Sequence, residues 1–368
     1  MKDNPRESQR LKITLAVDAM GGDNAPKAVI EGVSLALKRY PKAHFILFGD
    51  EQQIQDCIKA VRLDVSRIEI RHSDEIITPD MKPSAALRRA KGSSMRMAIE
   101  AVKNGDADAV VSAGNTGAYM ALSKIILRTL RGIDRPAITA PLPTATGSAV
   151  MLDLGANVDC DTNNIVQFAI MGEIYSKAIH GISSPSVGLL NVGEEDTKGN
   201  STVQEAAQII REHGHIKNFS GFIEGNDIFL GNIDVIVTDG FSGNISLKTA
   251  EGASKMFSNF FKNQVQGSFW NKIRYFAARK LFKDFKAKFD PRIYNGAPFL
   301  GLNGIAVKSH GGCDGFAFSY AVGVAYNLVD QKVIEQIAHE VEACSPDAEG
   351  SNVIPISAGI GKEESKVS

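Results

Sequence analysis

The sequence predicts an α/β protein with a mostly parallel β-sheet covered by helices on both faces. Short runs of Val, Ile, Leu and Ala alternate with helical patterns along the chain. Six of these runs end in a loop that combines Gly with Asn, Asp, Ser or His. Because ligands bind at the carboxyl ends of parallel strands, we expect all six loops to converge on one site.

The first half of the chain contains four of the expected strands. The segment 73–92 is expected to be a polar loop, and Ser93 or Ser94 is expected to cap the helix that follows. We expect strands at 13–17, 44–48, 68–71 and 109–111, and helices at 27–39, 52–61, 95–103 and 118–130.

The second half repeats the pattern. The proline-rich run 133–143 is expected to be a loop or an edge strand, because proline cannot donate to a strand ladder. We expect strands at 149–152, 187–190, 235–237 and 305–307, with a helix at 164–180.

The loop after the first strand is the clearest candidate for ligand binding. Its two glycines allow the backbone to approach a ligand, and a helix N-terminus after Pro26 offers free N–H groups to an anion. It matches neither G-x-G-x-x-G nor the lysine-containing phosphate loop. Its candidate binding residues are Asp18, Gly21, Gly22, Asp23 and Asn24.

The other five loops add mainly amide, hydroxyl and carboxylate side chains. Their candidate residues are Ser112, Asn115 and Thr116; Asp153 and Asn157; Asn191 and Lys198; Asp239, Gly240 and Asn244; and His310. Such groups bind anions and stabilise an oxyanion without a covalent intermediate.

Other chemistry remains open at these loops. Cys313 is an alternative nucleophile near His310, and His310 either exchanges a proton or is a structural hydrogen-bonding residue. Neither a G-x-S-x-G nor an H-E-x-x-H motif is present. Hydride, phosphoryl and acyl transfer all remain compatible with these residues.

The segment 255–292 differs from the rest of the chain. It contains ten Lys or Arg but two acidic residues, with aromatic residues at helical spacing. This pattern predicts a protruding basic helical hairpin that contacts an anionic membrane surface or an acidic partner. The alternative is a helical pair that packs on itself or on a second subunit.

Composition limits the remaining possibilities. The net charge of -1 gives no general attraction to nucleic acid, and the four separated cysteines favour neither a disulfide framework nor a metal site. We expect a single catalytic domain at 12–345, flexible ends at 1–11 and 346–368, and a location in the cytoplasm with peripheral membrane association.

Several long motifs resemble the bacterial phosphate acyltransferases of phospholipid synthesis, the acyl-ACP:phosphate transacylases. They occur in order over nearly the whole chain. The blocks are AVDAMGGDNAP (16–26), ALRRAKGSSM (86–95), VSAGNTGAYMA (111–121), GIDRPA (132–137), MLDLGANVD (151–159), VGLLNVGEEDTKGN (187–200), VTDGFSGNISLKTAEG (237–252), and NGAPFLGLNG with KSHGG (295–312).

This resemblance implies attack of inorganic phosphate on a long-chain acyl-ACP (acyl carrier protein) thioester. The expected products are free ACP and an acyl phosphate, which a membrane glycerol-3-phosphate acyltransferase consumes. The resemblance further implies an isocitrate/isopropylmalate dehydrogenase-like homodimer that needs no cofactor or metal. We expect Asn191, Lys198 and His310 to be catalytic, and Arg88, Arg89 and Lys91 to contact ACP.

Three rival functions are compatible with parts of the sequence. A phosphotransacetylase-like enzyme would use acyl-CoA instead of acyl-ACP. An NAD- and Mg-dependent oxidative decarboxylase of the same architecture would need a carboxylate cluster for its metal. A non-catalytic membrane scaffold would explain the basic segment but not the six polar loops.

Overall fold

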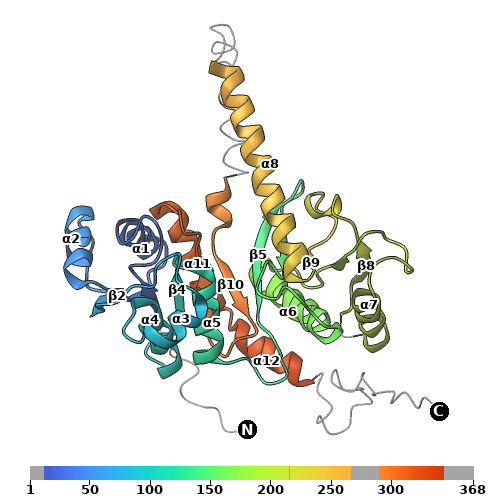
Figure 1. Ribbon diagram of the computed structural model, residues 1–368, viewed down its shortest axis with the longest axis horizontal. Coiled ribbons are helices and arrows are strands. Elements are labelled where there is room, and N and C mark those ends of the chain that lie inside the picture. The colour runs from blue at the N-terminus through green and yellow to red at the C-terminus, as the bar shows by residue number, and fades with distance from the viewer. Residues whose placement is uncertain (1–11, 215, 267–279, 281–289, 344–368) are drawn as a thin grey trace.

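The computed structural model describes residues 12–214, 216–266, 280 and 290–343, which fold around an 11-stranded sheet (Figure 1). The expected flexible ends lie outside the described residues. The strands are β1 (Ile13–Asp18), β2 (Ala43–Gly49), β3 (Ile68–His72), β4 (Ala109–Ser112), β5 (Ala137–Pro143), β6 (Ser148–Leu152), β7 (Val187–Leu190), β8 (Phe219–Ile223), β9 (Val235–Val237), β10 (Ala297–Leu300) and β11 (Ile305–Lys308).

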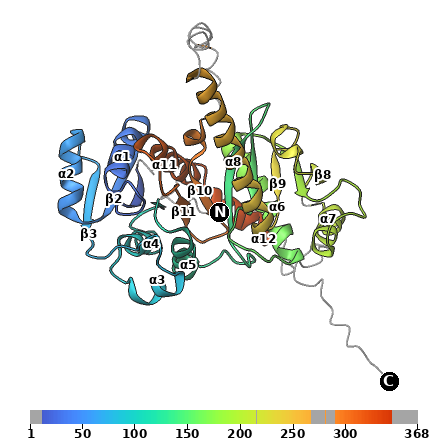
Figure 2. The same cartoon turned by 45° about the horizontal axis from the view of Figure 1, so that its top comes forward.

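The helices surround this sheet, with α1–α5 on one side of the central strands and α6 and α7 on the other (Figures 1 and 2). They are α1 (Lys27–Arg39), α2 (Glu51–Val61), α3 (Pro83–Arg89), α4 (Ser94–Asn104), α5 (Thr116–Leu127), α6 (Thr162–His180), α7 (Ser201–His213), α8 (Gly240–Gln266), α11 (Gly315–Asp330) and α12 (Val333–Ala343), with 3₁₀ helices η1 (Asp227–Phe229) and η2 (Pro291–Tyr294).

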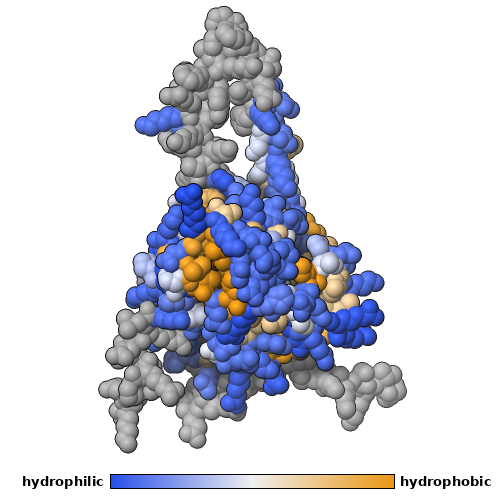
Figure 3. Space-filling view, turned by 90° about the vertical axis from the view of Figure 1, so that its left-hand side faces the viewer, coloured by the Kyte–Doolittle hydropathy of each residue, from blue (hydrophilic) through white to orange (hydrophobic). Residues whose placement is uncertain are grey.

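Both faces of the sheet are buried, as the continuous apolar runs predict. Leu15 and Val17 pack into one core with α1, α11 and α6, whereas Ala16 packs into a second core with α4 and α5. Successive side chains of a strand point to opposite faces, so β1 contributes to both cores. The outer surface beside α1 and α2 is mostly hydrophilic around a hydrophobic patch (Figure 3).

The strand direction reverses across the middle of the sheet. The order is β3-β2-β1-β4-β11-β10-β5-β6-β9-β7-β8. Strands β1 to β4 and β11 are parallel, and so are β6 to β9, but the steps β11–β10, β10–β5 and β5–β6 are antiparallel. The carboxyl ends of β4 and β6 therefore point in opposite directions, and the six polar loops form two groups. The convergence of all six loops on one site stays a prediction.

Several predicted elements match the structure, including α1, β7 and β9 with their bounds. The predicted loop 73–92 is wrong in part because it contains α3, whose first residue, Pro83, suits a helix start. The helix expected at 118–130 instead begins at Thr116, where the Asn115 side chain accepts the Ala118 N–H.

The proline-rich strand β5 lies inside the sheet, so its assignment as a loop or edge strand is also wrong. Its recorded pairing with β10 stops at Ile138. Pro141 and Pro143 pair with β6 alone. The missing proline N–H groups are therefore tolerated where β5 has one neighbour.

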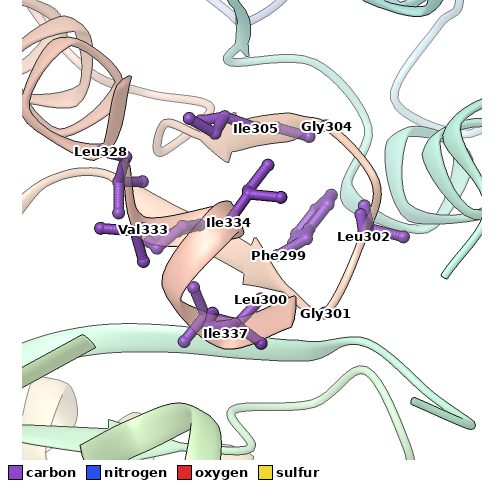
Figure 4. A pocket seen from close by; sticks show the side chains of 12 residues that line it. Phe299, Leu300, Gly301, Leu302, Gly304, Ile305, Leu328, Val333, Ile334 and Ile337 are labelled. Carbon is purple, nitrogen blue, oxygen red and sulfur yellow. The ribbon is translucent and has the colours of Figure 1, made fainter. Parts of the chain in front are cut away.

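The protein has a small apolar cavity between β10, β11, α11 and α12 (Figure 4). Its volume is about 10 Å³, and it is lined by side chains such as Phe299, Ile334 and Ile337. This volume holds at most one water molecule. The cavity is a packing feature of the core.

Gly172 of α6 packs directly against the sheet. A Cβ at this position would lie 2.6 Å from Val235 Cγ1 and 2.8 Å from Leu152 Cδ2. Gly172→Ala is therefore expected to destabilise the protein by about 1–3 kcal/mol through overpacking. Gly252→Ala in α8 meets no atom within 4 Å and is the matched control, with a gain of up to about 1 kcal/mol. Urea unfolding of both variants tests this difference, and equal changes would contradict it.

Candidate functional site

The first group of polar loops follows β1, β4 and β11, and the Asp18 carboxylate lies at its centre. Ser94 Oγ and Ser112 Oγ each donate to Asp18 over 2.7 Å, and the Met20 N–H donates over 3.3 Å. Asp18 is 1% exposed. Burial raises the pKa of Asp18, and these hydrogen bonds oppose the shift. Asp18 thus joins β1, β4 and the start of α4.

Lys308, at the end of β11, brings a buried ammonium group to the same loops. Its Nζ donates to the carbonyl oxygens of Ala113 and Ser309. Burial lowers the pKa of Lys308 to about 8, against the opposing effects of Cys313 and Asp18. Lys308 is not among the site residues predicted from the sequence, although a lysine at the end of a buried strand and before Ser-His-Gly-Gly is a detectable signal.

The glycines of these loops allow a close approach of backbone to backbone. A Cβ on Gly21 would lie 2.7 Å from Gly114 N, and Gly22 has a φ of 104° beside Gly311 O. Within the described residues, no hydrogen bond is recorded from the N–H groups of Gly21, Gly22 and Gly311. Backbone N–H groups in glycine loops and a lysine are the kinds of donor that bind an oxyanion.

His310 follows Lys308 and has a defined orientation. Its N–H donates to Asn295 Oδ1 over 2.9 Å, and its ring Nδ1 accepts the Gly312 N–H over 3.2 Å. Because Nδ1 is an acceptor, we assign the proton of the neutral ring to Nε2. Nε2–H is therefore the donor that the His310 ring offers to a ligand.

Cys313 is not placed as a nucleophile. It is 7% exposed, and its sulfur accepts a hydrogen bond from Ser309 Oγ over 3.3 Å. Burial raises the pKa of Cys313, which disfavours the reactive thiolate. The burial of Cys313 favours a site that acts without a covalent intermediate on this cysteine.

The second group of loops follows β6 and β9. Asp153 is fully buried, and burial raises its pKa against its hydrogen bonds. Asn157 Nδ2 donates to Asp153 and to Pro136 O over 2.9 and 2.8 Å. The backbone N–H groups that donate to Asp153 come from Ile138, Gly155, Ala156 and Asn157. The carboxylate of Asp153 is thus occupied by its own loop and by the Ile138 N–H of β5.

The start of α8 packs on this second group. The Gly240 N–H donates to Asn157 O over 2.7 Å, and Asp239 accepts the Ser242 N–H over 2.6 Å. The Asn244 side chain lies beside Gly155. The structure therefore brings together the predicted residues of the β6 and β9 loops.

The loop after β7 carries Asn191 and Lys198. Asn191 Nδ2 donates to the carbonyl oxygens of Gly193 and Lys198, both over 3.1 Å. Lys198 is exposed, and no ion pair of its Nζ is recorded within the described part of the chain. Asn191 shapes the loop, and the Lys198 ammonium remains available to a ligand.

Strand register places the two groups close together despite the reversal. Lys308 pairs with Ala297 of β10, while Ile138 of β5 pairs with Phe299 and donates to Asp153. At about 4.8 Å between strands and about 3.4 Å per residue, Lys308 and Asp153 lie roughly 16 Å apart in a flat sheet. One extended substrate is long enough to contact both groups.

Arg88 and Arg89 line a cavity of about 510 Å³ together with Lys82. Asn115 connects its wall to the first group, because Asn115 Nδ2 donates to the carbonyl oxygens of residues 79 and 81. Lys91 is not among the lining residues. Within the described residues, no cluster of three His, Cys, Asp or Glu side chains is arranged to hold a metal.

The α/β fold, with its mostly parallel sheet flanked by helices, is shared with phosphotransacetylases. A phosphotransacetylase from Streptococcus pyogenes aligns with a TM-score of 0.56 at 16% identity, covering 90% of this chain and 94% of that protein. The EutD phosphotransacetylase from Staphylococcus aureus aligns with a TM-score of 0.55 at 17% identity, covering 87% and 94%. This similarity establishes the fold.

The family follows from closer relatives. The model of the family described as "Fatty acid synthesis protein" matches residues 13–336. A phosphate acyltransferase of Paramagnetospirillum magneticum is 51% identical over 91% of this chain and 95% of its own length. One of Rhodospirillum centenum is 48% identical over 92% and 98%. The chain belongs to this family of phosphate acyltransferases.

The buried Lys308 predicts a pH dependence of stability. Its pKa falls from 10.5 in a free lysine to about 8 in the fold. Between these values the unfolded chain binds more protons than the folded chain, so stability rises with pH. Between about pH 7.5 and about pH 9.5, the free energy of unfolding of wild type should rise by about 2 kcal/mol relative to that of Lys308→Met. Urea unfolding at each pH measures this; Lys248→Met, at an exposed lysine, is the control.

Parallel stability curves for wild type and Lys308→Met would show that Lys308 titrates normally in the folded protein. Groups present in both proteins contribute equally, so the difference between the two curves isolates Lys308.

Proposed function

We propose that this protein transfers a long-chain acyl group from acyl-ACP to inorganic phosphate, which yields an acyl phosphate and free ACP. The observation that carries the proposal is the buried Lys308 ammonium on the Ala113 loop, which Gly22 approaches closely. In the part of the chain that the structure describes, the N–H groups of Gly21, Gly22 and Gly311 have no recorded acceptor. These donors suit a phosphate ion. Family membership supports the acyl transfer.

The proposed reaction needs no covalent enzyme intermediate, since phosphate is itself the nucleophile. A phosphate oxygen attacks the thioester carbonyl carbon, and a tetrahedral oxyanion forms. The C–S bond then breaks, and the carrier thiolate takes a proton. The enzyme's contribution is to hold both reactants in line and to stabilise the oxyanion.

Each group of loops receives a role in this proposal. The first group binds phosphate through backbone N–H groups and Lys308, while Asp18 and Asp23 hold the loop in shape. The phosphate end of the site also includes Ser112, Asn115 and Thr116. The His310 Nε2–H and the Lys198 ammonium stabilise the oxyanion and protonate the leaving thiolate, and Asn191 holds the Lys198 loop. The second group, with Asp153, Asn157, Asp239, Gly240 and Asn244, binds the thioester end.

The basic cavity at Lys82, Arg88 and Arg89 is the proposed contact for ACP, with Lys91 beside it. An acidic carrier protein would be attracted to these cations, mainly through faster association. Because Asn115 holds this wall next to the first group of loops, a carrier bound here would have its thioester near the phosphate.

Helix α8 is the proposed contact for an anionic membrane surface or for the second subunit of a homodimer. It extends away from the body of the protein (Figure 1). Its exposed apolar side chains include Met256, Phe257 and Phe260. The rest of the predicted hairpin, including Phe269 and Trp270, lies outside the described residues. Membrane contact would bring the acyl phosphate to a membrane glycerol-3-phosphate acyltransferase; unchanged vesicle flotation of Phe257→Ser/Phe260→Ser would contradict this role.

None of the described helices combines the length and apolar character that crossing a membrane requires.

A second candidate function is acyl transfer between phosphate and acyl-CoA. The shared fold with the phosphotransacetylases favours it. The two functions use the same chemistry and differ in the carrier of the thioester. The carrier is therefore the variable that the experiment must change.

Phosphate-dependent release of thiol from palmitoyl-ACP tests the proposed function. We expect acyl phosphate and free ACP in equal amounts with palmitoyl-ACP, and much slower release with palmitoyl-CoA. Preference for palmitoyl-CoA would support the phosphotransacetylase-like alternative. NAD reduction, or no turnover with either thioester, would overturn the proposed function.

The same assay tests the basic cavity when Arg88→Glu/Arg89→Glu is compared with wild type. The variant should raise KM for palmitoyl-ACP at least about tenfold at low salt, because each reversed charge repels an acidic carrier. Its KM for phosphate should stay unchanged. Lys59→Glu/Arg62→Glu, at two exposed cations at the end of α2, serves as the charge-matched control.

Lys198→Ala should lower kcat by about 100-fold or more if its ammonium stabilises the oxyanion. The KM for phosphate should change little, because the first group of loops binds phosphate. Steady-state kinetics at saturating phosphate measure the effect, with Lys59→Ala as the control. Unchanged turnover would remove Lys198 from the mechanism.

A further inference from the structure

The segment Asp290–Gly296 leads into β10. We call the part of the chain from the start of α8 to η2 the α8 excursion. The chain leaves the body at the second group of loops, where the Gly240 N–H donates to Asn157 O. It returns through η2 beside α11, the helix that follows the His310 loop. The start of α8 therefore lies at the second group of loops, and η2 lies at the first group.

Arg292 binds both the returning segment and α11. Its guanidinium donates to Asp290 Oδ2 over 2.6 Å and to Asp314 Oδ2 over 2.9 Å, and it lies 4.9 Å from the centre of the Phe316 ring. Asp314 caps α11 by accepting the Ala317 N–H over 2.8 Å. Arg292 thus attaches η2 to the first turn of α11.

Both the oxygen and the nitrogen of the Asn295 amide form hydrogen bonds with the loop between β11 and α11 or with the start of α11. Its Oδ1 accepts the His310 N–H over 2.9 Å. Its Nδ2 donates to Ser309 Oγ and to Ala317 O, both over 2.8 Å. One side chain therefore fixes the residues before and after the His310 loop as well as His310 itself.

The close packing of the next residue keeps this segment in place. Gly296 has a φ of 115°, and a Cβ there would lie 2.8 Å from Ala321 Cα in α11. A side chain would separate the segment from α11. The backbone at 295–296 is therefore held against the helix at a fixed distance.

We infer that Asn295 and Arg292 are positioning residues for the reaction: they set the orientation of His310 toward the substrate. The inference rests on the proposed role of His310 in acyl transfer and adds residues that do not touch the substrate. The Arg292–Asp314 pair is exposed, and such pairs contribute little to global stability, so this pair is better explained by the geometry that it imposes. Because the segment follows the α8 excursion directly, it also links that excursion to the catalytic loop.

A double-mutant cycle tests whether these residues act through His310. Asn295→Ala and Arg292→Gln should each lower kcat about tenfold or more, with KM for phosphate within about twofold of wild type. In the His310→Ala background, the same substitutions should have no further effect on kcat. Additional losses of equal size in both backgrounds would overturn the inference, because they would show a role independent of His310.

Matched controls exist elsewhere in the chain. Arg71 also bridges two carboxylates, Glu69 and Asp106, and lies over a ring, that of Phe48. Asn303 Nδ2 donates to a loop carbonyl, Thr129 O, over 2.7 Å. Arg71→Gln and Asn303→Ala should leave kcat unchanged. A loss of kcat equal to that of the test variants would overturn the inference.

A readout without turnover separates this inference from the proposed function. Reaction of His310 with diethyl pyrocarbonate, followed by peptide mass spectrometry, should change in rate at least about threefold in Asn295→Ala and Arg292→Gln. Unchanged rates overturn the inference even if acyl transfer is confirmed. If His310→Ala keeps full activity, the inference about Asn295 and Arg292 is overturned. Phosphate-dependent turnover by that variant would still support the proposed function.

Discussion

The antiparallel steps between β11, β10, β5 and β6 reverse the strand direction in the middle of the sheet, and the position of every polar loop depends on them. In a wholly parallel sheet, all six loops would line one edge. Here they form two groups that short strands keep within roughly 16 Å of each other. This distance suits two reactants, a small anion and a long thioester, better than one compact ligand.

The electrostatics of the first group favour binding of an anion without covalent chemistry. Asp18 and Lys308 are both buried, and burial opposes the charged form of each. Bringing an anion next to Lys308 compensates for its desolvation, whereas Asp18 is already occupied by two hydroxyl groups. Since Cys313 is held as a thiol, the loops present donors and no activated nucleophile. Direct attack by a bound phosphate needs only such donors.

The sequence was sufficient for features with a local physical cause. Continuous apolar runs predicted the buried strands, glycine with polar residues predicted the loops, and helix start signals predicted α1. The reversal was not predictable in this way, because β10 and β5 are far apart in the chain and short runs do not specify a pairing direction. Lys308 was missed for a related reason: a lysine after a strand usually points to solvent, and its burial depends on loops from β1 and β4.

The two loop groups belong to different halves of the sheet, so contacts between the halves must fix their relative placement. Helix α6, which packs against α12 and shares a core with α1 and α11, contributes to this placement. The sheet supplies it through β10 and β5, which join the halves by backbone hydrogen bonds. In-line attack loses rate steeply when the reactants shift by an ångström. Under the proposed function, the fixed register between β10 and β5 therefore keeps the two bound substrates aligned.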